Sequence, residues 1–407
     1  MGRWYGPLVA ALVAVVSLAC GAARAGAQAN QHTDALNLDP QVRQGYERFY
    51  NLDFNGALNI FNKVAQEHPQ DPMAWNYVLV VTIFRTLYDQ DLLDTTYYAH
   101  DSFLSNKRQI DVSQATRNEI EDLTNKVIGM CDAELKNNPE DKNALFARGY
   151  ARGFHAVFIT LVDHSFAAAA RQGYQARNDS EAVLKIDPQY ADAKMAVGIQ
   201  LFAVASLPRF VRLVVGFMGV GGSKPRGLAL LRDAAMHGVV TSVESKTILS
   251  LFLRHDGRYA EALDVERGLA AQYPHNYLFR LEVANLLKDE GQGEQAMATY
   301  KQVLADAQKP GYFVDPRLQL AWFGLADTER GYNQIPAAAY GYTQVVEQPT
   351  CSDWLKRRAA LDAGEMDDVL HKRDEAVRMY RIAAAPGGDQ SQAEAARRYL
   401  RTPFVGK

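Results

Sequence analysis

The sequence has few cysteines, no excess of charge of one sign and no apolar run long enough to cross a membrane. Its 407 residues include three cysteines, and 44 basic residues stand against 47 acidic ones. A net charge of -3 gives neither the basic footprint of a nucleic-acid-binding protein nor a polybasic membrane patch. We therefore expect no nucleic-acid partner and no framework of disulfides.

Two of the cysteines, Cys131 and Cys351, lie far apart in segments with a helical pattern. In an array of stacked units, distant units rarely touch, so a bond between these two thiols is not expected. We interpret both as small buried hydrophobes.

Motifs of catalysis are also missing. No HExxH, Gly-x-Ser-x-Gly or paired-cysteine spacing occurs. The glycine cluster at 216–224 fails as a phosphate loop because Ser223 precedes Lys224 and Pro225 follows it. His155 and His164, with Asp163 beside the second, are nine residues apart and do not share one helical face. The sequence thus predicts a protein that is not an enzyme and has no cofactor or metal, although a site without a local motif remains the alternative.

The N-terminus has the pattern of an export signal. Arg3 is followed by the short apolar run Pro7–Ala19 and by Ala25-Gly26-Ala27, a small-x-small cleavage site. These features predict a signal peptide over 1–27, or over 1–29 if cleavage follows Ala29, and then a flexible linker over 28–37. The mature protein is expected in the periplasm or at the cell surface.

Cys20 offers a different interpretation of the same segment. A bacterial lipoprotein is acylated on such a cysteine, but Ser17 stands where leucine is usual. Lipidation of Cys20 and an uncleaved anchor are therefore alternatives to a soluble exported protein.

Self-comparison shows a repeat of 34 residues. When 243–276 is placed above 277–310, Leu249 falls on Val283, Gly257 on Gly291 and Ala262 on Ala296. Glycine permits the left-handed conformation that ends a first helix. Alanine permits the closest approach of a second helix. The pattern predicts antiparallel helix pairs.

Further units carry the same pattern with altered spacing near Gly45 and Ala57, from Trp322 to Val345 and from Gly364 to Pro386. We predict irregular pairs with insertions over 38–240, a regular array with a capping helix over 241–401 and a tail over 402–407.

These residues resemble the tetratricopeptide repeat (TPR) family, whose signature is Trp-x2-Leu-Gly-x2-Tyr in the first helix and Ala, Phe, Ala and Pro in the second. The resemblance implies an all-α, right-handed superhelical solenoid of about eight helix pairs with a C-terminal capping helix, of the exported bacterial type.

The middle of the chain departs from this period. The apolar stretch 199–222 is interrupted by Pro208, Arg209 and Arg212, so it is too short for a membrane helix. With Gly227 and Leu228 it resembles a segment of the TPR proteins linked to inclusion clearance at the mitochondrial outer membrane. Packing inside the superhelix is expected, and exposure toward a partner or lipid is the alternative.

The TPR resemblance also implies a function. First helices line a concave groove that usually holds peptides, and Lys246, Arg280 and Glu282 lie on such helices. We predict a scaffold that binds a protein or peptide in this groove. The alternatives are an envelope lipoprotein that aids outer-membrane assembly and a carrier of an apolar ligand in the 199–222 region. Contact with a membrane is expected only if Cys20 is lipidated or that region is exposed.

Overall fold

A computed structural model describes residues 32–95, 110–207, 221–386 and 390–406. In these ranges the chain forms seventeen α-helices and two short 3-10 helices, with no strand. The predicted signal peptide and Cys20 lie outside the described residues. No helix in the described ranges has the length and apolarity needed to span a bilayer.

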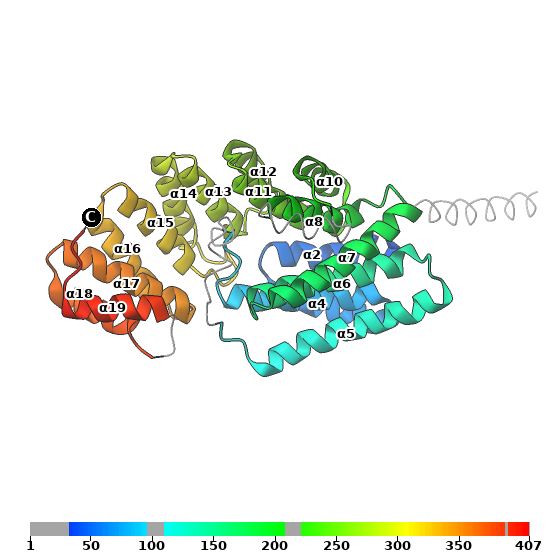
Figure 1. Cartoon of the computed structure of the whole chain (residues 1–407), viewed down its shortest axis with the longest axis horizontal. Helices are drawn as coiled ribbons and strands as arrows, with labels where there is room; N and C mark the ends of the chain where they lie inside the picture. Colours follow the sequence, from blue (N-terminus) through cyan, green and yellow to red (C-terminus); the bar gives the residue numbers. More distant parts are fainter. Residues whose placement is uncertain (1–31, 96–109, 208–220, 387–389, 407) are drawn as a thin grey trace, which may run out of the picture.

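The described helices form eight consecutive pairs followed by a single capping helix, as predicted. Figure 1 shows their order along the array. The pairs are α2 (Pro40–Tyr50) with α3 (Phe54–Glu67), α4 (Pro72–Asp89) with α5 (Gln114–Asn137), α6 (Lys142–Leu161) with α7 (Phe166–Ile186), α8 (Lys194–Ser206) with α10 (Lys224–His237), α11 (Ser242–His255) with α12 (Tyr259–Gln272), α13 (Tyr277–Asp289) with α14 (Gly293–Asp306), α15 (Gln319–Gly331) with α16 (Ile335–Glu347) and α17 (Asp353–Val369) with α18 (Arg373–Ala383). The capping helix is α19 (Gln390–Arg401), packed on α18.

Aspartates start several helices of the N-terminal pairs. The side chain of Asp39 accepts a hydrogen bond from Gln41 N at 2.6 Å, and Asp71 accepts one from Met73 N at 2.8 Å. Prolines follow directly at Pro40 and Pro72, where the missing N–H is not needed. Asp-Pro therefore marks where these two helices begin.

The first helices of six pairs end with a residue in the left-handed conformation. Gly257 and Gly291 have φ angles of 72° and 82°, which confirms the role predicted for them. Each turn closes with a hydrogen bond of 2.8 Å from the next residue to the helix, Arg258 N to Leu253 O and Gln292 N to Leu287 O. The other four positions hold residues with a side chain, which cost conformational energy there: Leu52, Asp91, Asn333 and His371.

Small residues let the helices of each pair approach. Ala262, Ala296, Ala338 and Ala376 are completely buried, as the repeat predicts for the close contact in each pair. Large phenols fill the space beside them, and Tyr300, Tyr342 and Tyr380 are completely buried as well.

The structure describes part of the predicted linker over 28–37 and most of the predicted tail over 402–407. Thr33 and Asn37 are buried, and a 3-10 helix at Ala35–Leu38 packs on α2 and α4. Asn37 Oδ1 accepts a hydrogen bond of 2.6 Å from the buried phenol of Tyr77, so residues 33–37 belong to the folded array. In the tail, Phe404 N donates to Asp368 Oδ2 at 2.8 Å, which ties this end to α17.

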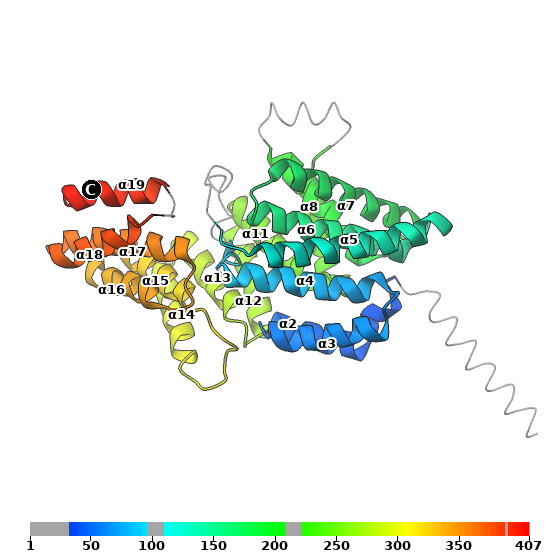
Figure 2. The ribbon, with the colours of Figure 1, turned by 90° about the horizontal axis from the view of Figure 1, so that it is seen from below.

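The array folds back on itself, which the sequence analysis did not expect. Helix α2 and the end of α4 lie beside α11 and α13 in both views (Figures 1 and 2). The Tyr50 hydroxyl donates to Glu244 at 2.8 Å, and the Tyr277 hydroxyl donates to that of Tyr88 at 2.9 Å. Distant units therefore do touch. Cys131 and Cys351 are nevertheless free thiols.

Candidate functional site

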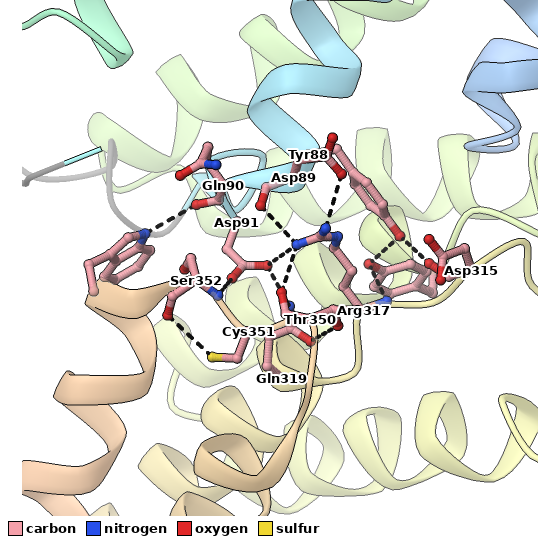
Figure 3. Close-up of polar contacts among 12 residues, drawn as sticks. Tyr88, Asp89, Gln90, Asp91, Asp315, Arg317, Gln319, Thr350, Cys351 and Ser352 are labelled. Carbon is pink, nitrogen blue, oxygen red and sulfur yellow. Dashed lines mark hydrogen bonds and ion pairs between the residues drawn. The ribbon is translucent and has the colours of Figure 1, made fainter. Parts of the chain in front are cut away.

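A cluster of polar contacts holds the end of α4 against the later units (Figure 3). We call this cluster the joint, and it is formed by Asp89, Asp91, Arg317, Gln319, Thr350 and Ser352. Arg317, just before α15, donates from Nη1 to the carbonyls of Asp89 at 2.9 Å and Thr350 at 2.8 Å. Its Nη2 donates to the Asp89 carboxylate at 3.0 Å. One guanidinium thus bridges α4 and the connection between α16 and α17.

Asp91 is the acceptor at the centre of this joint. It is 1% exposed and lies in the left-handed turn after α4. Gln319 Nε2 donates to its Oδ1 at 2.7 Å, and Ser352 N donates to its Oδ2 at 2.8 Å. Burial raises the pKa of Asp91, and these hydrogen bonds and Arg317 oppose that rise. The joint holds residues 88–92 in a defined position next to the cavity described below.

A largely apolar cavity of about 230 Å³ lies where α2, α4 and α6 face α11 and α13. Aromatic rings make much of its wall. Part of the rim is only half-buried, including Phe84, Ile248 and Phe279, so apolar surface faces the opening. The rings that line the cavity are Phe49, Tyr50, Phe54, Phe84, Phe154 and Phe279.

Glu244 of α11 joins this wall to the first unit. The Tyr50 hydroxyl donates to its two oxygens at 2.8 and 2.9 Å. Burial raises the pKa of Glu244 to about 7, although the hydrogen bond from Tyr50 works in the other direction. At neutral pH this carboxyl is therefore close to its midpoint of titration.

Glu282, predicted as a groove residue, lines the same cavity. Arg254 Nη1 donates to it at 2.9 Å, and Arg254 Nε donates to Asp289 at 2.6 Å. Asn285 Nδ2 adds a hydrogen bond of 3.1 Å to Glu282. The charge of Glu282 is thus balanced inside a buried network.

Glu266 of α12 also lines the cavity, and neither of its oxygens has a hydrogen-bond partner. Its side chain is 1% exposed. Burial, with Glu282 nearby, raises its pKa well above the ordinary value. Sequence reasoning missed this residue, although a signal was present: Glu266 lies between Ala262 and Leu269 on the apolar stripe of its helix.

The other two predicted groove residues do not line the cavity. Lys246 Nζ donates to Gln272 on the surface at 3.2 Å, and Arg280 pairs with Asp306 at 2.7 Å. These contacts join neighbouring helices and leave Lys246 and Arg280 as untested predictions of a binding role.

The histidine group considered for metal binding is dispersed. His155 Nε2 is 3.1 Å from Glu121, and burial lowers the pKa of this histidine. Asp163 pairs instead with Arg117. Within the described ranges, no group of three or more His, Cys, Asp or Glu residues is placed to hold a metal ion.

The glycine-rich segment is only partly described. Residues 208–220 lie outside the described ranges, with most of the 199–222 region. Ser223 caps α10, and Lys224 pairs with Asp256 at 2.6 Å. The part of this region in α8 is packed, since Phe202 stacks on Phe252 with ring centroids 4.0 Å apart.

Comparison with known proteins agrees with the repeat pattern. The family model of the tetratricopeptide repeat matches residues 253–322. No curated protein matches the chain in sequence. This match covers the part of the chain where the 34-residue register is clearest.

Solved structures give weaker likenesses. PilF of Pseudomonas aeruginosa is 15% identical, with 61% of this chain and 96% of that chain covered and a TM-score of 0.39. Yeast Tom70 is 11% identical, with 89% of each chain covered and a TM-score of 0.42. PilW, described as a type IV pilus biogenesis factor, is 18% identical, with 61% of this chain and 98% of that chain covered and a TM-score of 0.41. TM-scores this low carry no information about partners.

Proposed function

We propose, on the premise that this chain is a tetratricopeptide repeat protein, that it is a non-catalytic scaffold that holds a protein or peptide partner at the cavity between its first and middle units. The observation that carries the proposal is the half-buried apolar rim around Phe84, Ile248 and Phe279. An apolar rim beside a concave cavity favours a partner that buries apolar side chains there.

The closed shape of the array supports a binding role for this face. The joint at Asp91 and Arg317 fixes the end of α4, so that the cavity wall is held in place before any partner arrives. A preformed site loses less conformational entropy on binding than a flexible one. The first and middle units therefore act together as one binding surface.

The proposed location is the bacterial envelope, after removal of 1–27. The basis is the sequence pattern at Arg3, Pro7–Ala19 and Ala25–Ala27. Mass spectrometry of the mature N-terminus tests it. An N-terminus at Gln28 supports a soluble exported protein, whereas a diacylated Cys20 supports the lipoprotein alternative.

Site-specific crosslinking tests the scaffold function. A photoreactive amino acid replaces Ile248 at the rim in one variant and the exposed Asp264 on α12 in a control variant. After illumination in envelope extract, the Ile248 variant should form a defined protein adduct that excess unlabelled chain prevents. Equal adducts from both positions, or none from Ile248, would contradict the proposal.

A carrier of an apolar ligand is the second candidate, and the apolar wall of the cavity favours it. In the sequence analysis this function was attached to 199–222, most of which is not described. Denaturing extraction of the purified protein followed by lipid analysis separates the candidates. Stoichiometric lipid with no crosslinked protein would favour the carrier.

A further inference from the structure

We infer that the cavity also binds a small molecule that has an apolar body and one ammonium group, with the ammonium held by Glu266. This site is separate from the rim contacts of the scaffold function and does not depend on a protein partner. Its ligand chemistry follows from the size, charge and unpaired groups of the cavity.

Size limits the ligand to a small molecule. The cavity has about 230 Å³, and an engineered cavity of about 150 Å³ in another protein binds benzene. One ring with a short chain therefore fits, whereas a folded segment of peptide does not. The rings of Phe49, Phe54 and Phe154 provide an apolar wall for such a body.

Charge favours a cation. Glu244, Glu266, Glu282 and Asp94 all line the cavity. Arg254, which is not among the lining residues, pairs with Glu282 of this group and with Asp289. A negatively charged ligand would meet several carboxyl groups, and the described residues that line the cavity include no Lys or Arg to balance them.

Glu266 is the group that lacks a partner. Glu244 accepts from Tyr50, and Glu282 accepts from Arg254 and Asn285. Both oxygens of Glu266 are buried without a partner at normal hydrogen-bond geometry, and the influence of the nearby Ser250 hydroxyl does not offset its burial. An ammonium carries three donors and satisfies such a carboxylate, and the surrounding rings add cation–π attraction.

A competing arrangement involves Arg254. Its Nη2 is also buried without a partner, and its charge acts on Glu266. If Glu266 turned to pair with Arg254 Nη2, it would be ionised in the free protein. If it stays apart, burial favours its protonated form, and binding of an ammonium group favours loss of that proton. Release of a proton that is lost in Glu266→Gln therefore distinguishes the two arrangements, because Glu244 in the same cavity also titrates near neutral pH.

Calorimetric titration of the full mature chain tests the inference with three probes of one shape. These are 2-phenylethylammonium, the neutral 2-phenylethanol and the anionic 3-phenylpropanoate. We expect the ammonium to bind at least about tenfold more tightly than the alcohol and the anion not to bind. In buffers of different ionisation enthalpy at pH 7, binding of the ammonium should release a proton.

Two variants test whether Glu266 is the residue that binds the ammonium group. Glu266→Gln should weaken ammonium binding at least about tenfold and abolish proton release, while binding of the alcohol stays within about threefold. Asp264→Asn, exposed on the same helix, should behave as the unaltered protein. If Glu266→Gln does not fold, the three-probe comparison on the unaltered chain still tests whether the cavity prefers an ammonium ligand.

Three results would overturn the inference. The first is an ammonium that binds no more tightly than the alcohol. The second is binding without proton release, which would mean that Glu266 is already paired with Arg254. The third is equal binding of lysine blocked at both ends, which would assign the site to the lysine side chain of a protein partner instead.

Discussion

The N-terminal units contact the later ones at the joint and at the cavity. A buried carboxyl group is present in both places, but its hydrogen bonding differs between them. In the joint, Asp91 is 1% exposed and both its oxygens accept hydrogen bonds. In the cavity wall, Glu266 is equally buried and neither oxygen has a partner. The joint is built as a structural contact, whereas the cavity keeps an unpaired polar group at a cost in stability.

Burial alone therefore does not show what a carboxyl does. A buried carboxylate with good partners holds elements together, and its loss leaves those partners unsatisfied. A buried carboxyl without partners destabilises the fold and marks a candidate site. Three changes test this contrast, and a fourth tests the turn of the repeat.

The largest effect is expected from Asp91→Ala. It leaves Ser352 N and Gln319 Nε2 without their acceptor and removes a charge beside Arg317, so we expect a loss of about 3–4 kcal/mol in the free energy of unfolding. Urea denaturation followed by circular dichroism measures it. Asp89→Ala is the control, because Asp89 is 53% exposed, and it should cost about 1 kcal/mol or less. Equal losses from both changes would refute the role given to Asp91.

The second effect is on pH dependence and involves Glu244. Its folded pKa of about 7 lies above the ordinary value of 4.5, so the folded protein keeps a proton that the unfolded chain releases. The contribution of Glu244 is greatest below pH 4.5, falls by about 3 kcal/mol between pH 4.5 and 7 and then stays level.

Glu244→Gln removes this titration while leaving an acceptor for Tyr50. The difference in unfolding free energy between the unaltered protein and this variant should therefore change across that pH window. Asp34 and Asp367, whose pKa values are raised to about 6 by burial, titrate in both proteins and cancel in the difference. A difference that is flat from pH 4.5 to 7 would show that Glu244 is not buried as described.

A smaller effect of opposite sign is expected from Glu266→Leu. Replacing an unpaired buried carboxyl with an apolar side chain should raise the free energy of unfolding by about 2 kcal/mol. Thermal and urea denaturation measure the gain, and binding of 2-phenylethylammonium should be lost at the same time. A loss of stability would show that Glu266 has a stabilising partner.

The smallest effect tests the repeat itself. Gly257→Ala should cost about 1 kcal/mol, because φ is 72° at this turn. Gly268 is the matched control, since it lies exposed inside α12 with open space around it. Gly268→Ala should instead stabilise by about 0.5–1 kcal/mol. The same sign for both changes would contradict the turn geometry.

The repeat could be predicted from the sequence because its determinants are local. Gly257 and Gly291 end first helices through backbone conformation, and Ala262 and Ala296 fit one close contact in each pair. Each of these requirements depends on residues within one unit, so a 34-residue comparison finds them. Pairs with inserted residues were still placed because glycine, alanine and proline kept their order.

The contacts by which the N-terminal units fold back on the later ones could not be predicted by comparing repeats. The contact between Asp91 and Ser352 depends on the sum of small rotations over many units, and no local pattern records that sum. The cavity is formed by these same contacts between distant units, so its lining residues could not be predicted as a group either. Glu282 is predicted as a groove residue from its place on a first helix, whereas Glu266 lies on a second helix and is not among the predicted groove residues.

Amide hydrogen exchange of the mature chain, with and without 2-phenylethylammonium, tests the central claim most directly. The account predicts added protection in α11, α12 and α13 around Glu244, Glu266 and Glu282, with no change in residues 315–352 at the joint. Added protection confined to the joint, or no change anywhere at a saturating concentration, would contradict the account.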